Sequence, residues 1–177
     1  SQVAKGNLTM EEAEAVKSRI SFTDNAKTAA ENADFVNESV TEDLDLKRKV
    51  WAQFGELCPE HTVFTTNTSY LLPSQFADST GRPERFCAFH FHDVFWANVV
   101  DVMPHPGTAP WIVKLLTELG WKLDQTPVVV RKESPGYIFN AMLIALVGAA
   151  GNLVTKGIAD HKDVDRSWMG NFKMELG

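Results

Sequence analysis

The stretch that decides how this chain is organised is 86-FCAFHFHDVFWANVVDV-102. Its first part predicts a buried strand, in which successive side chains point to opposite faces, so His90 and His92 share one face. Its end, residues 99–102, predicts a second strand with Asp101 as a single acid among valines. A buried carboxylate needs a protonated or hydrogen-bonding partner, and a histidine on a neighbouring strand is the nearest one. We therefore expect His90 and Asp101 to form an acid/base pair.

Composition indicates a globular protein. The chain has 177 residues, enough for one domain or for one domain and part of a second. Hydrophobic residues make up 44% and charged residues 23%, as in soluble proteins. The net charge of -6 and the lack of a Lys/Arg cluster argue against nucleic acid as a partner.

Cysteine use and hydropathy suggest a cytoplasmic protein without a membrane partner. Cys58 and Cys87 are the two cysteines, too few to staple a fold, so a reducing compartment is expected. The polar residues 1–7 are unlike a signal peptide. The longest apolar run, 137–150, contains Asn140 and is too short to cross a bilayer.

Hydrophobic periodicity predicts alternating helices and strands. Helices are expected from about Met10, over 25–32, 42–57, 108–120 and 135–154, and after Asp160, with Thr108 as a cap. Strands are expected at 20–23, 34–40, 62–66 and 126–131, besides the two central strands. This order favours an α/β fold with a mainly parallel sheet and flanking helices. From residue 132 only helices follow, so we place a domain boundary between 1–131 and 132–177.

Polar side chains fall where three of these strands end. Glu38 ends one strand, the turn Asn67–Ser69 follows the next, and His90 lies near the end of a third. In open α/β sheets the ligand lies beyond the carboxyl ends of the strands. Each signal alone is weak, because Asn and Ser are common in turns, but together they predict a binding site.

Four motifs in order resemble the 3-hydroxyacyl-CoA dehydrogenases, including bacterial 3-hydroxybutyryl-CoA dehydrogenases. They are Thr66-Asn67-Thr68-Ser69, the pair His90-Phe91 twenty-one residues later, the Val-Val-acid-Val strand, and Ser134-Pro135-Gly136-Tyr137-Ile138-Phe139-Asn140. The resemblance extends from about Leu8 to Gly177. It implies an incomplete Rossmann-like NAD-binding domain over 1–131. It also implies that 132–177 begins a C-terminal helical domain for substrate binding and dimerisation.

This resemblance implies NAD-dependent oxidation of an L-3-hydroxyacyl-CoA to the 3-ketoacyl-CoA, in fatty-acid or butanoate metabolism. His90 would be the general base, and Asp101 would stand where the family has a Glu that orients the imidazole. Ser69 would hydrogen-bond the substrate oxygen, and Asn140 would complete the site from the second domain. The enzyme would take an acyl-CoA substrate and form a homodimer.

The same resemblance assigns the cofactor contacts to three residues. Glu38 and Asn67 match positions near the ribose and nicotinamide of NAD, and Asp93 is grouped with them. No Gly-x-Gly-x-x-Gly occurs in the 177 residues, and that turn cradles the pyrophosphate. We therefore expect a shortened member of the family with impaired NAD binding and poor turnover.

The chain also departs from the family around the histidine. The family usually has His-Phe-Phe-Asn-Pro, whereas this chain has His90-Phe91-His92-Asp93-Val94. The acid is Asp instead of Glu, after a segment one residue shorter. The Arg that commonly follows the helix Asn is Ala141 here. These changes indicate a divergent branch with altered placement of substrate or cofactor.

Two alternative functions stay open. His90, His92 and Asp93, with His105 nearby, are residue types that bind metal, and imidazoles two apart on a strand can face one ion. Otherwise His92 is expected to be structural or solvent-facing. The second alternative is a non-catalytic, oligomer-forming remnant of the family, because apolar helices and free sheet edges need a partner surface.

Overall fold

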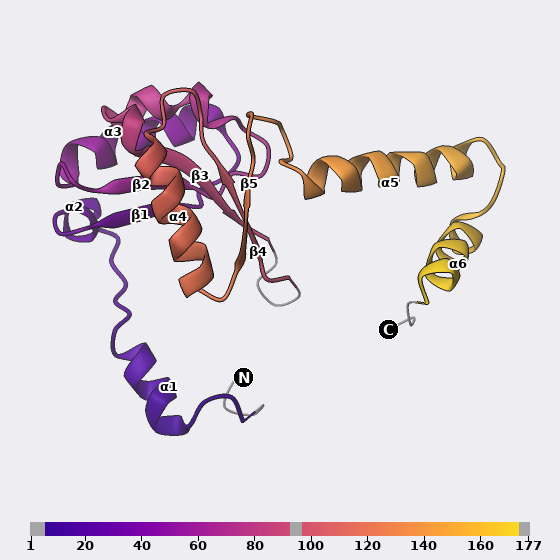
Figure 1. The fold of residues 1–177 in the computed structure, drawn as a ribbon, viewed down its shortest axis with the longest axis horizontal. Helices are drawn as coiled ribbons and strands as arrows, with labels where there is room; N and C mark the ends of the chain where they lie inside the picture. The colour runs from indigo at the N-terminus through magenta and orange to yellow at the C-terminus, as the bar shows by residue number, and fades with distance from the viewer. Residues whose placement is uncertain (1–5, 93–96, 174–177) are drawn as a thin grey trace.

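The computed structural model describes residues 6–92 and 97–173, and a five-stranded sheet lies at their centre (Figure 1). Its strands are β1 (Phe35–Glu38), β2 (Val63–Thr66), β3 (Phe86–Phe91), β4 (Val99–Met103) and β5 (Thr126–Val129), and they pair in that order. Strands β1–β2, β2–β3 and β4–β5 are parallel, whereas β3 and β4 are antiparallel. The expected α/β fold with a mainly parallel sheet is confirmed.

The helices follow the expected pattern closely. They are α1 (Met10–Lys17), α2 (Ala26–Ala30), α3 (Leu44–Leu57), α4 (Pro110–Lys122), α5 (Phe139–Thr155) and α6 (His161–Phe172). Short 3-10 turns lie at η1 (Pro73–Gln75), η2 (Ala77–Thr80) and η3 (Pro83–Arg85). Side-chain caps mark the starts of two helices. The carboxylate of Asp43 accepts the Leu46 amide ahead of α3, and the carboxylate of Asp160 accepts the Asp163 amide ahead of α6.

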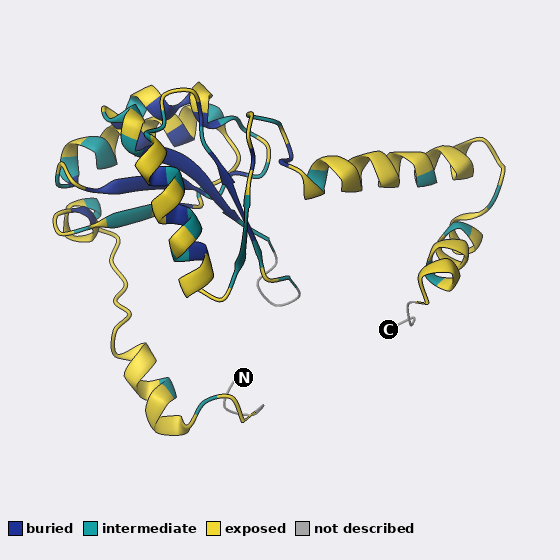
Figure 2. Cartoon of the chain, viewed as in Figure 1, coloured by how far each residue is buried: buried dark blue, intermediate teal, exposed yellow. Residues whose placement is uncertain are grey.

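Both faces of the three central strands, β2, β3 and β4, are largely buried, which explains their apolar character (Figure 2). On one face, Trp51 of α3 packs on Phe64 and Phe86, with ring centroids 5.2 Å apart in each pair. On the other face, Ile112 and Leu116 of α4 join the second cluster. That cluster also contains Val63, Cys87, Phe89, Val100 and Val102. His90 therefore lies on the side of β3 that Phe86 and Ala88 share.

Two local predictions were wrong. Residues 20–23 do not form a strand: they lie between α1 and α2, with Ile20 56% and Phe22 95% exposed, and β branching alone does not make a strand without a neighbour to pair with. Thr108 does not cap α4, whose N-cap is Ala109. The Thr108 hydroxyl instead donates to the Phe86 carbonyl and accepts from the His105 amide, so it ties β3 to the following loop.

Helices α5 and α6 extend away from the sheet in Figure 1 and form a helical hairpin, in which α5 is apolar and α6 is mostly polar. α5 has no buried residue, and its exposed apolar side chains include Met142, Leu143, Ile144 and Val147. Within residues 6–92 and 97–173, no helix combines the length and hydropathy needed to cross a membrane. The domain boundary at residue 132 stays a prediction.

Candidate active site

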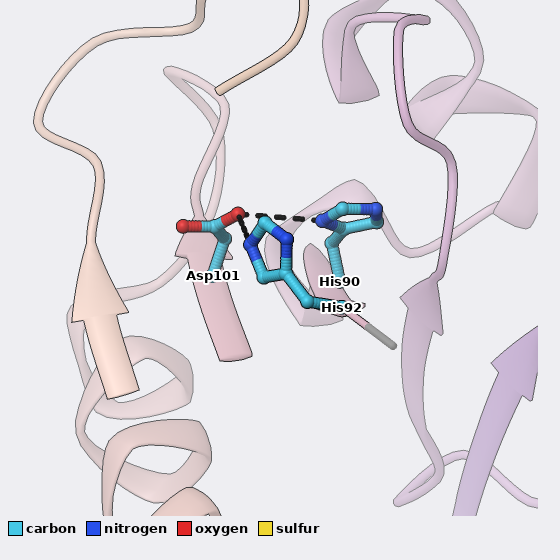
Figure 3. A group of neighbouring side chains, drawn as sticks. All are labelled: His90, His92 and Asp101. Atoms are coloured by element: carbon cyan, nitrogen blue, oxygen red, sulfur yellow. Dashed lines mark hydrogen bonds and ion pairs between the residues drawn. The ribbon is translucent and has the colours of Figure 1, made fainter. Parts of the chain in front are cut away.

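The antiparallel register of β3 and β4 places His90 directly opposite Asp101. The distance from His90 Nδ1 to Asp101 Oδ2 is 3.3 Å (Figure 3). Both residues are buried, at 4% and 1% exposure. The structure thus brings together the two residues whose pairing the sequence predicted. Water is largely excluded from the pair, which strengthens its electrostatic interaction.

A second histidine contacts the same carboxylate oxygen. His92 Nε2 lies 2.8 Å from Asp101 Oδ2, and its side chain is only 10% exposed. Of the two roles expected for His92, structural or solvent-facing, this contact agrees with the structural one. His92 immediately follows β3 and repeats the two-residue spacing, which turns it to the same side as His90. The two imidazole centroids are 4.9 Å apart.

The other nitrogen of His90 faces Ser69. Ser69 Oγ lies 3.2 Å from His90 Nε2, on the turn that follows β2. A carboxylate accepts hydrogen bonds and does not donate them, so the proton of a neutral His90 belongs on Nδ1. Nε2 then carries the lone pair and accepts from the Ser69 hydroxyl. This tautomer suits a general base, because the free nitrogen points away from the acid that orients it.

Tyr137 covers the imidazole of His90 and was not predicted to take part. The two rings stack with centroids 4.6 Å apart and planes at 11°. The Tyr137 hydroxyl donates to the Thr68 carbonyl at 2.6 Å, and burial raises its pKa. Gly136 and Tyr137 both have positive φ, at 75° and 54°. The Ser-Pro-Gly turn was a visible signal for a bend here, but the ring contact depends on tertiary structure.

A pocket of about 760 Å³ opens beside these residues. Its lining comes from three segments: the turn after β2, the end of β3 with the start of β4, and the first turn of α5. The lining residues are Ser69, His90, Phe91, His92, Ala97, Val99, Phe139 and Asn140. Three of the four predicted catalytic residues therefore face one pocket, and Asp101 lies behind His90.

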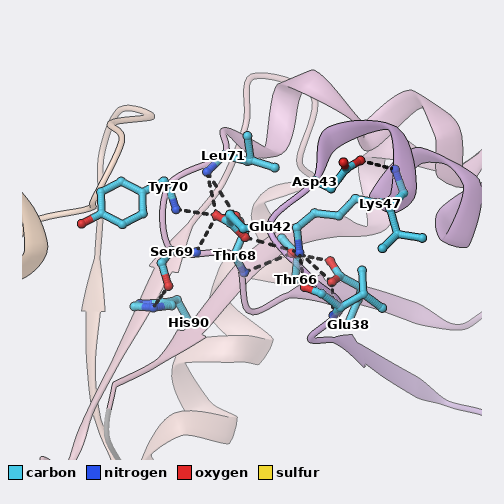
Figure 4. A network of polar contacts seen from close by, with 12 residues as sticks. Glu38, Glu42, Asp43, Lys47, Thr66, Thr68, Ser69, Tyr70, Leu71 and His90 are labelled. Carbon is cyan, nitrogen blue, oxygen red and sulfur yellow. Dashed lines mark hydrogen bonds and ion pairs between the residues drawn. The ribbon is translucent and has the colours of Figure 1, made fainter.

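The turn that carries Ser69 is held by Glu42 (Figure 4). Glu42 Oε1 accepts the amides of Ser69, Tyr70 and Leu71 at 3.1, 2.8 and 3.2 Å, and also the Thr68 hydroxyl. Burial acts to raise the pKa of Glu42. These hydrogen bonds and the nearby ammonium of Lys47 outweigh it, so the pKa is lowered. No local motif revealed this contact, because the partners are 26 to 29 residues apart.

Two of the residues assigned to the cofactor make internal contacts. Glu38 is 4% exposed and accepts the Lys47 ammonium at 2.7 Å, the Val40 amide at 2.6 Å and the Thr66 hydroxyl at 2.8 Å. Asn67 Oδ1 accepts the Phe91 amide at 2.8 Å. Both residues therefore tie strand ends together, and neither is among the pocket's lining. Their roles toward a cofactor stay predictions, and Asp93 lies outside the described residues.

The set of residues that could bind a metal ion differs from the one expected from the sequence. His105 does not join the other histidines: its Nε2 lies 2.9 Å from the Pro83 carbonyl and its Nδ1 accepts the Gly107 amide. Asp93, the expected carboxylate ligand, is outside the described residues. Asp101 takes the corresponding position beside His90 and His92.

Comparisons with known proteins give consistent matches. The family model described as "3-hydroxyacyl-CoA dehydrogenase, NAD binding domain" matches residues 1–134. A lambda-crystallin homolog from Homo sapiens is 34% identical over 162 residues, 91% of this chain and 50% of the relative. L-carnitine dehydrogenase from Pseudomonas sp is 34% identical over 152 residues, 85% of this chain and 47% of the relative. 3-Hydroxybutyryl-CoA dehydrogenase from Clostridioides difficile is 30% identical over 166 residues, 93% of this chain and 58% of the relative.

Solved structures agree with these matches. That of (S)-3-hydroxybutyryl-CoA dehydrogenase from Ralstonia eutropha superposes with a TM-score of 0.92 at 25% identity, covering 99% of this chain and 62% of that one. A diketoreductase structure reaches a TM-score of 0.86 at 36% identity, covering 93% of this chain and 59% of that one. The chain spans about half the length of the curated relatives that it matches.

Proposed function

Because this chain belongs to the 3-hydroxyacyl-CoA dehydrogenase family, we propose that it carries the acid/base centre of an NAD-dependent oxidation of L-3-hydroxyacyl-CoA to 3-ketoacyl-CoA. One observation supports this most strongly. Asp101, His90 and Ser69 form a line of contacts at 3.3 and 3.2 Å that ends at the pocket. Such a line orients one imidazole nitrogen toward a substrate and leaves the other with the acid.

In this proposal His90 Nε2 takes the proton from the substrate hydroxyl. Asp101 keeps the proton of His90 on Nδ1 and stabilises the imidazolium that forms. Ser69, now bonded to Nε2, exchanges this partner for the substrate oxygen. Asn140 supplies an amide from the first turn of α5 on the same pocket wall. Bound NAD would supply the acceptor for the hydride on the carbon that bears the hydroxyl, so that the alcohol gives up a proton from oxygen and a hydride from carbon.

The residues present fit the reacting end of such a cofactor better than its phosphates. The pocket offers imidazole, hydroxyl and amide groups on an otherwise apolar lining, which suits an uncharged ring and an alcohol. The 177 residues contain no Gly-x-Gly-x-x-Gly to hold a pyrophosphate. We therefore expect the 177-residue polypeptide by itself to bind NAD weakly.

The test is NADH formation from L-3-hydroxybutyryl-CoA over a wide range of NAD concentrations. We expect measurable turnover with a high KM for NAD, and a fall in kcat of about 10²- to 10⁴-fold in His90→Gln. His61→Gln is the matched control, because His61 also pairs with an acid, Asp34 at 2.8 Å, but on the exposed surface. Unchanged kcat in His90→Gln, or no NADH at any NAD concentration, would refute the proposal.

We also propose that the α5–α6 hairpin pairs with a second copy of the chain. Its grooved face is lined by Leu146, Val147, Leu153, Val164, Trp168 and Phe172, and an exposed apolar surface of this kind favours association. Sedimentation equilibrium should give a dimer that Leu146→Asp weakens. A strictly monomeric wild type at high concentration would contradict this proposal.

The buried free thiols of Cys58 and Cys87 fit the expected reducing, cytoplasmic location.

A further inference from the structure

We propose that His90, His92 and Asp101 form a binding site for one transition-metal ion of the zinc class. This goes beyond the dehydrogenase activity, which needs only the pairing of His90 with Asp101. The starting observation is that two imidazoles converge on one oxygen of a buried carboxylate (Figure 3).

The geometry is close to that of three ligands around one ion. One donor atom from each residue lies within 4.8 Å of the other two. Ligands about 2.0–2.1 Å from a tetrahedral zinc ion are roughly 3.3 Å from each other. The 3.3 Å between His90 Nδ1 and Asp101 Oδ2 already matches that spacing. The 2.8 Å between His92 Nε2 and the same oxygen needs to open by roughly half an ångström. The donor nitrogens of the two imidazoles lie within 4.8 Å of each other, so they need to close by up to roughly 1.5 Å.

The donor set and its surroundings suit such an ion. Two imidazole nitrogens and one carboxylate oxygen favour zinc, cobalt or nickel over magnesium or calcium. His90 and Asp101 stand opposite each other on paired strands, and His92 immediately follows β3, so two of the three ligands are already held in place by the sheet. His90 and His92 line the pocket, which gives an ion a path from solvent and leaves room for water as a fourth ligand. Among the described residues that line the pocket, none is a Lys or Arg that would repel a cation.

A bound ion and the proposed base exclude one another. The ion would replace the proton on His90 Nδ1. A neutral imidazole that binds metal through Nδ1 carries its proton on Nε2, the nitrogen that faces Ser69. Nε2 then has no lone pair with which to accept a substrate proton. Metal binding would therefore switch the acid/base centre off.

His92 distinguishes this site from an ordinary His–Asp pair. Without His92, the remaining His90 and Asp101 give only two ligands, too few for a firm zinc site. His61 with Asp34 is such a two-ligand pair, at 2.8 Å on the exposed surface. His92→Phe and His61→Gln thus remove comparable contacts with different expected effects on metal binding.

The experiment is a titration of the untagged, chelator-treated 177-residue chain with Co²⁺ and with Zn²⁺. Visible absorption reports the coordination of cobalt, calorimetry gives the stoichiometry for zinc, and circular dichroism verifies that each variant is folded. We expect one ion per chain, an affinity at least about 100-fold lower in His92→Phe, and no change in His61→Gln. Asn140→Ala, which leaves all three ligands, should also bind normally.

Three results would overturn the proposal: no binding to the wild type, equal affinity in the wild type and His92→Phe, or loss of binding in His61→Gln. Inhibition of NADH formation by zinc, reversed by a chelator, is a second readout that rests on the proposed dehydrogenase function. Cobalt binding is measured without substrate or NAD. A failure of metal binding can therefore be distinguished from a failure of the proposed dehydrogenase activity.

Discussion

Replacing Glu38 by Gln tests whether this residue holds the fold together. Lys47 Nζ is 2.7 Å from Glu38 Oε1, and the two side chains are only 1% and 2% exposed. At an effective dielectric constant of about 20, unit charges at this separation attract by roughly 6 kcal/mol, which desolvation of both groups largely offsets. Breaking such a buried pair costs about 3–5 kcal/mol, because the remaining charge stays buried.

For Glu38→Gln we expect the lower end, a loss of about 3 kcal/mol in the free energy of unfolding. Lys47 keeps two other partners, the Val40 carbonyl at 3.1 Å and Glu42 Oε2 at 3.5 Å. The double variant Glu38→Gln/Lys47→Met removes the stranded charge. It should therefore be more stable than the sum of the single losses by about 1–3 kcal/mol.

The assay is urea denaturation followed by circular dichroism and by Trp fluorescence. The matched control is Glu14→Gln, because Glu14 and Lys17 are also 2.7 Å apart but are 61% and 70% exposed. That change should cost less than about 0.5 kcal/mol. If Glu38→Gln were as mild as the control, the carboxylate would not be structural, and its assignment to a cofactor would gain support.

Three further changes test the surroundings of His90. Gly136→Ala should cost about 1–3 kcal/mol, because φ is +75° and a Cβ would lie 3.2 Å from the amide nitrogen of Ala141; the thermal unfolding midpoint measures it. Tyr137→Phe keeps the ring stack but removes the bond to the Thr68 carbonyl, so urea titration should show a loss of about 1–3 kcal/mol with little change in KM. The pKa of Glu42 is lowered on folding, so its stabilisation is present above the unfolded-state pKa and is lost as pH falls through the lower folded-state pKa. Glu42→Gln should flatten that part of the stability profile in acid, by a modest amount because the Glu42 side chain is 37% exposed.

Sequence reasoning succeeded where a local period decided the geometry. Alternation along a strand placed His90 and His92 on one face, and the lone acid among valines required a buried partner, which the β3–β4 register supplies. Capping residues predicted the start of α1, where Thr9 and Glu12 form a capping box. Hydrophobic periodicity also located the five strands of the sheet and the strand ends at which polar residues collect.

It failed where a residue far away in the chain decides the outcome. Glu42 reaches the turn at Ser69, and Tyr137 stacks on His90 from 47 positions further along the chain. Neither contact leaves a periodic signal. Thr108 looks like a helix cap in the sequence, but the Phe86 carbonyl competes for its hydroxyl. The contact of His92 with Asp101 depends on side-chain directions that strand alternation does not specify.

The protonation of His90 is the central claim, and ¹⁵N NMR of the metal-free protein measures it directly. We predict that neutral His90 carries its proton on Nδ1, donated to Asp101, with Nε2 unprotonated toward Ser69. Asp101→Asn should disturb this tautomer, whereas His61→Gln should leave it unchanged. A neutral His90 protonated on Nε2 in the wild type would contradict the account, because the nitrogen that faces the pocket could then not act as a base.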